Sequence, residues 1–427
     1  MRTTGAAIII FFIILIIETY VYQSLKLLVK NLSAKKARLI ITIHWIIAAF
    51  CMAAFLYLQF SPRTAQPETI RTYLFTVIFA VYLSKFFGVI FLFIDDIRRF
   101  ILFIARSRKA ESSGKKISRS KFLNWMGLSF GGVMFGSLMI GLKNKYNYKI
   151  FTHFLGFNNL PNAFKGLKIV QISDIHSGSL KNKEAVAKGV ELIMQQNPDI
   201  ILFTGDLVNL VAEEFEPLKD IFKRLNAPMG VYSIMGNHDY GDYYNWDDKT
   251  PEQKKKDFET GRTVLSPLQK KNIDYLQDMQ RSIGWKMLND EHVILEKDGE
   301  KIALIGVQNI TGKGKRFQTY GNMAKAYQGV KDIPFKILMS HDPSHWDTEV
   351  LSKYPDIDLT LAGHTHGMQF GIELPGFKLS PSRFMFKHWA GLYKQGKQML
   401  YVNRGFGFIG YPGRVGIMPE ITVLNLG

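Results

Sequence analysis

Seven side chains in the second half of the chain are of types that bind divalent metal ions. They are Asp174, His176, Asp206, Asn237, His341, His364 and His366. Three carboxylate or carboxamide side chains and four imidazoles, with no thiolate, suit ions such as Mn, Fe, Zn or Mg. Seven donors are too many for one tetrahedral ion, whereas two ions that share a bridging carboxylate use all of them. This donor set predicts a two-metal site of the kind that hydrolyses phosphoesters.

Each of these side chains follows a short apolar run that indicates a buried strand. The runs are 167–173, 200–204, 230–235, 335–340 and 359–363. A glycine directly precedes Asp206, Asn237 and His364, where a tight turn would aim the side chain at the site. Any one of these blocks is more often a simple turn. Their combination favours five strand ends that converge on one catalytic site.

Composition divides the 427 residues near residue 149. Residues 1–149 hold 21 of the 54 Lys and Arg but 5 of the 36 Asp and Glu, so they carry +16 of the overall +18. These basic residues flank apolar runs rather than cover a folded face, and we therefore expect no nucleic-acid binding. From about residue 150, short β-rich runs alternate with amphipathic helical stretches. We predict a transmembrane region over 1–149 and a globular α/β domain over 150–427.

Four stretches are apolar and long enough to cross about 30 Å of hydrocarbon as helices. They run from about 6–28, 39–60, 72–94 and 122–142. Glu18 and His44 lie inside two of these spans, where we expect interhelical contacts rather than a substrate or proton path. The single cysteine, Cys51, lies in an apolar run, so no intrachain disulfide can form.

The placement of Lys and Arg predicts how the spans are oriented. Segments 30–38 and 98–121 are rich in Lys and Arg, whereas the segment between the second and third spans has Arg63 and Arg71. The rich segments should face the cytoplasm. Four spans then place the domain after residue 142 on the extracytoplasmic side of the cell membrane, although three lysines just after the fourth span argue the other way.

The chain resembles the calcineurin-like metallophosphoesterases through five blocks. These are Asp174-x-His176, Gly205-Asp206, Gly236-Asn-His-Asp239, His341 and Gly363-His-Thr-His366. Segments 401–407 and 412–421 are similar to the tail of the membrane-anchored subgroup, the transmembrane proteins with a metallophosphoesterase domain. The resemblance covers about residues 165–427. It implies a four-layer α/β/β/α sandwich with the dimetal site at the sheet edges, preceded by an all-α transmembrane region.

The resemblance also implies how the two metal ions would be bound. The ligands of the first ion would be Asp174, His176 and His366. A carboxylate, that of Asp206, would bridge to the second ion. The remaining ligands of the second ion would be Asn237, His341 and His364.

Four further side chains receive roles beside the metal ligands. His238 matches the family's histidine that binds the phosphoryl oxygen or protonates the leaving group. The resemblance implies that Asp239 orients His238 through a hydrogen bond. Arg404 and Arg414 are candidates for binding a further phosphate, and the alternative is that both have a structural role.

Residues 240–280 depart from the minimal family pattern. They begin with the aromatic-rich run 240–246, and the charged stretch after it contains three lysines at 254–256. The segment directly follows the block that contains His238. It is either a lid that selects the substrate or a surface insertion with a helix.

The predicted function is hydrolysis of a phosphoester or pyrophosphate bond by a membrane-anchored two-metal enzyme. The expected partners are membrane lipids and a phosphorylated, envelope or lipid-linked substrate, with no obligatory protein partner. One alternative is a UDP-diacylglucosamine-type pyrophosphohydrolase of lipid A synthesis, although the substrate of such enzymes is cytoplasmic. Another is a non-catalytic metal-binding sensor or scaffold. Lost ligands would mark that alternative, and none of the family's ligands is missing here.

Overall fold

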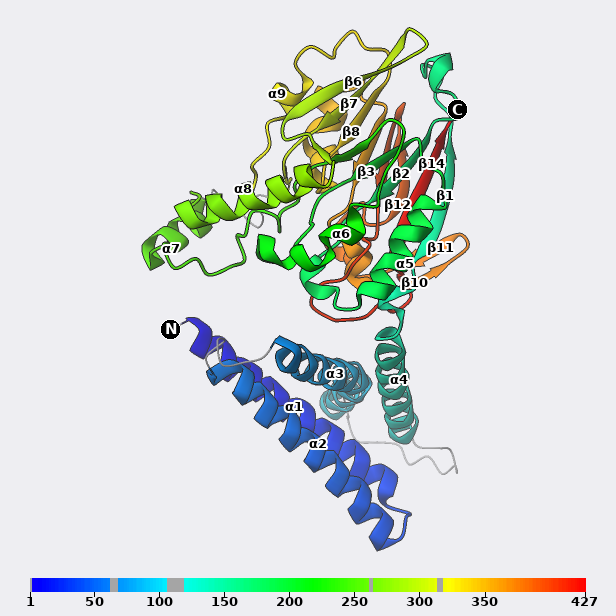
Figure 1. The fold of residues 1–427 in the computed structure, drawn as a ribbon. Helices are drawn as coiled ribbons and strands as arrows, with labels where there is room; N and C mark the ends of the chain where they lie inside the picture. The colour runs from blue at the N-terminus through cyan, green and yellow to red at the C-terminus, as the bar shows by residue number, and fades with distance from the viewer. Residues whose placement is uncertain (1, 62–67, 106–118, 261–263, 313–317) are drawn as a thin grey trace. The chain divides into compact units, whose positions relative to one another are not determined.

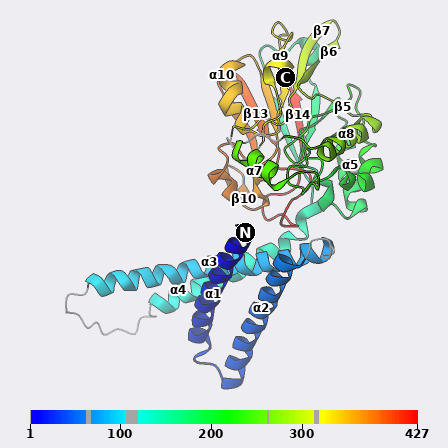
Figure 2. The same cartoon turned by 90° about the vertical axis from the view of Figure 1, so that its left-hand side faces the viewer.

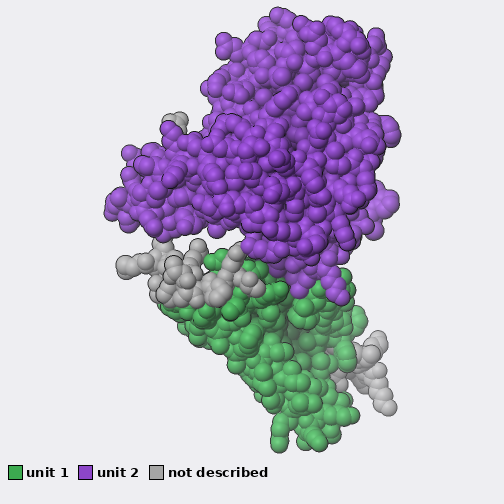
Figure 3. Space-filling model, viewed as in Figure 1, with its two compact units in different colours: residues 1–140 green, residues 141–427 purple. Residues whose placement is uncertain are grey.

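The computed structural model describes residues 2–61, 68–105, 119–260, 264–312 and 318–427. The basic residues 106–118, which contribute to the predicted orientation, and residues 261–263 of the 240–280 segment lie outside them. The chain divides into two compact units, Met1–Ile140 and Gly141–Gly427 (Figure 3). The domain boundary at 149/150 stays a prediction.

Long helices form the described part of the first unit (Figures 1 and 2). They are α1 (Arg2–Val29), α2 (Ala34–Phe60), α3 (Glu68–Ala105) and α4 (Arg119–Gly141). Many of their large apolar side chains are exposed, as expected for helices that lipid surrounds. Each helix contains a stretch long and apolar enough to cross a membrane, namely Ile8–Val29, Ala34–Phe60, Ile70–Arg98 and Phe122–Gly141. The prediction of four apolar helices is confirmed.

Glu18 lies in a polar cluster that joins three helices of this unit. Its carboxylate accepts hydrogen bonds from Lys85 Nζ at 2.7 and 2.8 Å and from Tyr82 OH at 2.8 Å. His44 Nε2 lies 3.4 Å from the same carboxylate. These are the interhelical contacts expected for Glu18 and His44. Lys85, which sequence reasoning did not single out, supplies the opposite charge that makes a buried carboxylate tolerable there.

Two six-stranded sheets dominate the described residues of the second unit (Figure 1). The first sheet has, in order, β1 (Lys149–Leu155), β14 (Glu420–Leu426), β2 (Lys168–Ile172), β3 (Ile200–Phe203), β4 (Val231–Ser233) and β5 (Lys286–Met287). The second has β12 (Gly391–Gln395), β13 (Gln398–Val402), β9 (Leu359–Ala362), β8 (Lys336–Met339), β7 (Glu300–Gly306) and β6 (Glu291–Lys297). A separate hairpin consists of β10 (Ile372–Leu374) and β11 (Phe377–Leu379).

Alternation along the strands produces four layers. In β2, Ile169 packs between the two sheets, whereas Val170 and Ile172 pack against the helices outside them. The helices on the first sheet are α5 (Lys183–Met194), α6 (Lys219–Phe222) and α8 (Pro267–Ser282). Those on the second sheet are α9 (Met323–Tyr327) and the turn η8 (Trp346–Val350). This arrangement confirms the α/β/β/α sandwich.

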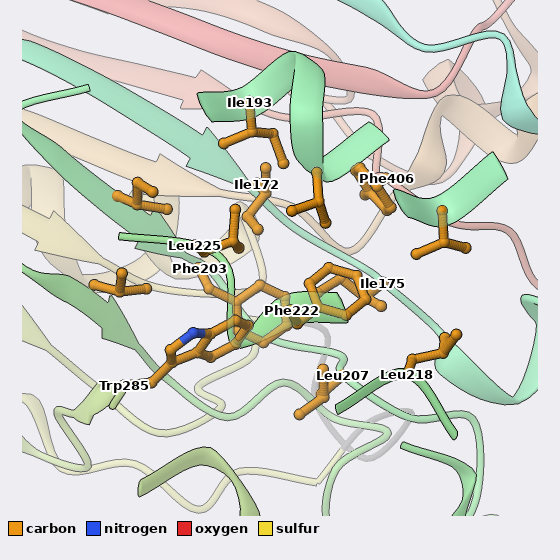
Figure 4. Packing of buried hydrophobic residues seen from close by; sticks show 14 of the residues in the cluster. Ile172, Ile175, Ile193, Phe203, Leu207, Leu218, Phe222, Leu225, Trp285 and Phe406 are labelled. Atoms are coloured by element: carbon orange, nitrogen blue, oxygen red, sulfur yellow. The ribbon is translucent and has the colours of Figure 1, made fainter. Parts of the chain in front are cut away.

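The outer layer on the first sheet is an aromatic and aliphatic core (Figure 4). The Trp285 ring lies 5.4 Å from the Phe203 ring and 6.3 Å from the Phe222 ring, measured between centroids. Ile172 from β2 and Ile193 from α5 belong to the same cluster. This packing anchors β2 and β3, whose ends carry three of the predicted ligands.

We expect Ile193→Val to lower the free energy of unfolding by about 0.5–1.5 kcal/mol, because it deletes one methylene from a fully buried side chain. The same change at Ile372, which is 53% exposed, should have almost no effect. Denaturant unfolding followed by tryptophan fluorescence measures both variants. Equal losses would contradict the core position of Ile193.

Candidate metal centre

The seven predicted ligands follow five strands drawn from both sheets. Asp174 and His176 follow β2, Asp206 follows β3, Asn237 follows β4, His341 follows β8, and His364 and His366 follow β9. β2, β3 and β4 are parallel to one another, as are β8 and β9. Their carboxyl ends therefore meet at one edge of each sheet, and the structure brings all seven side chains together.

The backbone at these strand ends is held in a conformation that L-residues rarely adopt. Five of the predicted ligands have a positive φ angle, namely Asp174 (51°), His176 (48°), Asp206 (61°), His364 (71°) and His366 (50°). Such strain persists only where surrounding structure enforces it, and it clusters at functional sites. A Cβ on Gly363 would lie 2.3 Å from Asp174 Oδ2, and one on Gly236 would lie 2.2 Å from Asp206 Oδ1. The glycines are therefore needed for close approach of neighbouring loops.

One group of donors gathers around Asp174. His366 Nε2 lies 3.3 Å from Asp174 Oδ1 and 3.0 Å from His176 Nε2. These three side chains are buried and can direct one donor atom each at a common point. They are the predicted ligands of the first ion.

A second group gathers around His341. Its Nε2 lies 3.1 Å from Asn237 Oδ1 and 3.2 Å from His364 Nδ1. Asp206 Oδ2 lies 3.1 Å from His341 Nε2 and 3.6 Å from His176 Nε2, so this oxygen stands between the two groups. This position suits the predicted role of Asp206 as a shared ligand, which stays a prediction.

The donor set fits two divalent cations. His176 Nε2 and His366 Nε2 face each other at hydrogen-bond distance, as do His341 Nε2 and His364 Nδ1. A pair of neutral imidazoles can share only one proton, whereas a cation between them satisfies both lone pairs. Carboxylate oxygens complete each group, and no thiolate is present among them. We infer that the residues suit borderline or hard ions, whose identity the donors alone do not select.

The charges of the cluster favour the metal-binding forms of Asp206 and His176. Burial by itself would raise the pKa of Asp206, but His341 and His238 hold that pKa well below its usual range. Burial, with His238 and His366 nearby, lowers the pKa of His176 well below its usual value. Asp206 is therefore ionised and His176 neutral near pH 7, which leaves a carboxylate charge and an imidazole lone pair for the ions. Burial alone would lower the pKa of His341, but the nearby carboxylates, chiefly that of Asp206, raise it to about 10, so this imidazole must release a proton to bind an ion.

His238 lies beside the metal ligands with one ring nitrogen already engaged. Its Nδ1 lies 2.8 Å from the carbonyl oxygen of Asn209 and donates to it. Its ring centroid is 4.4 Å from that of Tyr243 and 4.9 Å from that of His176. Nε2 is the nitrogen left to meet a substrate.

The structure corrects the role expected for Asp239. Its carboxylate accepts backbone N–H groups from Asp206, Leu207, Val208 and Gly236 at 2.7–3.2 Å, rather than a hydrogen bond from His238. Burial and the neighbouring Asp206 raise the pKa of this carboxyl to about 7. Asp239 therefore joins the loops after β3 and β4, and the Asn209 carbonyl orients His238.

Arg404 and Arg414 have protein partners in the structure. Arg404 donates to Glu373 and Glu420, with 3.0 Å between its Nε and Glu373 Oε2. Arg414 is fully buried and donates to main-chain carbonyl oxygens, including that of Arg404 at 2.8 Å. Phosphate binding by these two residues stays a prediction, and their contacts favour the structural role.

Two residues near the site escaped the sequence reasoning. Asp342 Oδ2 lies 3.9 Å from His364 Nε2 and accepts a hydrogen bond from Thr311 Oγ1 at 2.7 Å. Its signal was its place directly after His341. Tyr243 OH accepts a hydrogen bond from Asn237 Nδ2 at 2.9 Å. The aromatic run 240–246 pointed to this position without identifying the tyrosine that contacts the site.

The 240–280 segment is anchored close to the site at its beginning. The Tyr240 ring stacks on Tyr320 with 3.6 Å between centroids, and Trp246 Nε1 donates to the Gly241 carbonyl at 2.8 Å. The helix α7 (Pro251–Thr260) follows, and α8 then packs on the first sheet. The presence of a helix agrees with the interpretation of this segment as a surface insertion. The lid function stays a prediction.

A pocket of about 380 Å³ opens over the cluster. Five of the seven predicted ligands line one part of it together with His238, namely His176, Asp206, Asn237, His364 and His366. The rest of the wall is largely apolar, and its members include Met368, Met385, Phe386 and Ile409. A substrate that enters it would meet metal ligands on one side and a hydrocarbon-like wall on the other.

Comparison with known families identifies the class of protein. Residues 2–145 match the model described as "Probable Calcineurin-like phosphoesterase, transmembrane domain", and residues 167–368 match "Calcineurin-like phosphoesterase". The chain belongs to the calcineurin-like phosphoesterases that carry such a transmembrane domain.

Three relatives show the range of proteins that the chain is similar to. Metallophosphoesterase YkuE of Bacillus subtilis is 28% identical over 324 residues, which cover 73% of this chain and 98% of YkuE. The Danio rerio transmembrane protein with metallophosphoesterase domain is 27% identical, over 62% of this chain and 54% of that protein. UDP-2,3-diacylglucosamine pyrophosphatase LpxG of Chlamydia muridarum is 30% identical, over 58% of this chain and 81% of LpxG.

Proposed function

We propose that this protein is a membrane-bound two-metal hydrolase that cleaves a phosphoester or pyrophosphate bond in a lipid-linked substrate. The position of Asp206 Oδ2 carries the proposal, because this oxygen stands between two groups of metal-binding side chains at 3.1 and 3.6 Å. Membership of the calcineurin-like phosphoesterases supports phosphoester hydrolysis as the reaction class. The four apolar helices and the apolar pocket wall support a lipid-linked substrate.

The side chains divide the chemical work among them. The first ion would be held by Asp174, His176 and His366. The second ion would be held by Asn237, His341 and His364, and Asp206 would be shared by both ions. Two ions held there supply Lewis-acid activation of water and offset the charge that develops on the phosphoryl group. The Asn209 carbonyl keeps the His238 Nδ1 proton in place, so a protonated His238 can deliver its Nε2 proton to the departing oxygen.

His238→Ala is expected to lower kcat/KM by about 10²–10⁴-fold on a phosphodiester with an alkoxide leaving group, because such a group needs a proton to depart. The loss should be much smaller on bis(p-nitrophenyl) phosphate, whose nitrophenolate leaves without protonation. His292→Ala is the matched control, since its Nδ1 also faces a main-chain carbonyl, that of Ala326 at 3.0 Å. Equal losses of His238→Ala on both substrates would remove the acid role.

The reaction itself is tested with the full chain in detergent, loaded in turn with Mn²⁺, Fe²⁺, Zn²⁺ or Mg²⁺. Hydrolysis of bis(p-nitrophenyl) phosphate, p-nitrophenyl phosphate and a lipid phosphodiester should depend on the metal and cease with a chelator. A chain that binds about two ions yet hydrolyses none of these would instead favour the metal-binding sensor or scaffold.

A UDP-diacylglucosamine-type pyrophosphatase is the second candidate, because the chain is 30% identical to one over 277 residues. The predicted extracytoplasmic orientation opposes it. Hydrolysis of a UDP-linked glycolipid by the metal-loaded chain, together with protease protection of residues 150–427 in right-side-out membrane vesicles, would favour this candidate. Cleavage of the domain from outside such vesicles would support the orientation that we propose.

A further inference from the structure

The β10–β11 hairpin exposes its apolar side chains, whereas Glu373 on its opposite face is half-buried. Its register pairs Ile372 with Leu379 and Leu374 with Phe377, which places these four on one face. They form the apolar hairpin face, and their exposed fractions are 53%, 36%, 61% and 54% in that order. A hairpin on a water-facing surface normally shows the opposite arrangement.

Buried contacts hold the hairpin in this orientation. Glu373 and Lys378 pair across the strands on the opposite face. The Glu373 carboxylate accepts two hydrogen bonds from Arg404, a side chain that is almost fully buried. Lys378 Nζ donates to the Ala390 carbonyl and lies 4.5 Å from the Tyr393 ring centroid. Arg404 is buried and Glu373 is half-buried, so their ion pair holds this polar face of the hairpin toward the domain and leaves the apolar face outward.

Exposed apolar and basic side chains lie near the apolar hairpin face in sequence, and this combination favours binding to an anionic lipid surface. Phe384 is 85% exposed and Met368 is 40% exposed in the same stretch of chain. Residues 366–394 contain four Lys or Arg, of which Lys387 pairs with Asp347, and one Asp or Glu, which is Glu373 and pairs with Arg404. Exposed apolar side chains with basic neighbours bind the interface of membranes that carry anionic lipids.

The base of the hairpin is continuous with the pocket. The segment just before β10 contains Met368 and Gln369, which line the pocket over the metal cluster. Val415 accepts a hydrogen bond from Gly371 N–H and donates one to the Gln369 carbonyl, both at 2.8 Å.

We propose that the apolar hairpin face, with Phe384, docks on an anionic bilayer and delivers the phosphate of a membrane lipid to the metal-lined pocket. The docking step stands on the hairpin alone. The delivery step rests on the proposed hydrolase function.

Docking is tested on the full chain reconstituted in phosphatidylglycerol vesicles. Because Cys51 is the only cysteine, a Cys51→Ala background allows one fluorophore at Pro375→Cys in the β10–β11 turn, or at Lys297→Cys at the exposed end of β6 as the matched control. Lipids with brominated acyl chains should quench the label at 375 and leave the label at 297 unchanged. Lack of quenching at 375, or equal quenching at both positions, would overturn docking whether or not the protein hydrolyses anything.

Delivery of the lipid phosphate is tested with a double variant that carries both Leu374→Ser and Phe377→Ser. We expect turnover of a lipid phosphodiester in vesicles to fall at least tenfold, an effect of about 1.4 kcal/mol, while turnover of soluble bis(p-nitrophenyl) phosphate stays unchanged. Val264→Ser, at a side chain that is 70% exposed, is the control and should change neither rate. Equal losses on both substrates would overturn delivery. A second copy of the chain would be the occupant of this face if the double variant changed from oligomer to monomer in detergent and the label at 375 stayed unquenched. This result would also overturn delivery.

Discussion

Replacement of Asp206 by Asn is expected to reduce kcat/KM for every phosphoester substrate by at least about 10²–10³-fold, comparable to the loss of a preorganised charge-stabilising group. Asn keeps the size of the side chain but removes the negative charge that faces both groups of donors at 3.1 and 3.6 Å. Bound metal should fall below about two ions per chain, because the bridging carboxylate is lost. Steady-state kinetics and elemental analysis of the purified full chain measure the two effects.

Asp298→Asn is the control for this substitution. Asp298 has the same type of left-handed backbone, with φ of 51° against 61° for Asp206, but lies in the exposed β6–β7 turn. It should change neither metal content nor rate. If Asp206→Asn kept full activity and two ions, the shared-carboxylate arrangement would be excluded.

Replacement of Glu420 by Ala is expected to lower the free energy of unfolding by about 3–5 kcal/mol. The Glu420 carboxylate is fully buried and accepts hydrogen bonds from the Arg404 guanidinium, Tyr401 OH and Thr422 Oγ1. Its removal leaves Arg404 buried with less compensation. Glu296→Ala, which breaks an exposed 3.4 Å ion pair with Lys301, should cost about 1 kcal/mol or less. Denaturant unfolding of both variants gives the comparison.

The contribution of Glu420 should also depend on pH. Burial alone would raise the pKa of this carboxyl, but the charge of Arg404 holds it below its usual value. A carboxyl with a depressed folded-state pKa stabilises the protein above its unfolded pKa of about 4.3, and this contribution fades as the pH falls through the folded-state pKa. The stability difference between the native chain and Glu420→Ala should therefore shrink on acidification below about pH 4. A constant difference from pH 7 to pH 3 would contradict this assignment.

Local sequence patterns predicted the four apolar helices, the α/β domain and the proposed metal ligands, whereas the four-layer sandwich was implied by the family resemblance. Apolar runs of about 20 residues specify membrane helices because lipid offers no partner for unpaired backbone groups. Short buried runs that end in Asp, Asn or His specify strands whose ends carry ligands. The order of these blocks along the chain was enough to propose the metal-binding set, because each block contributes its own donor.

Contacts between distant segments were decided only by the tertiary structure. His238 is oriented by the Asn209 carbonyl, and Asp239 turned out to hold backbone N–H groups, because both loops must fold before either partner is defined. Lys85 became visible as the partner of Glu18 only when α1 and α3 were placed side by side.

The β10–β11 hairpin shows most clearly what the local sequence pattern leaves undetermined. Residues 372–379 read as an ordinary alternating strand pair, and alternation fixes which side chains share a face. It does not fix which face is buried. That choice follows from Arg404, which lies more than 20 residues away along the chain and draws Glu373 inward. Residue types thus determined the chemistry available to this protein, and the pairing of remote charges determined which surface it presents to a lipid.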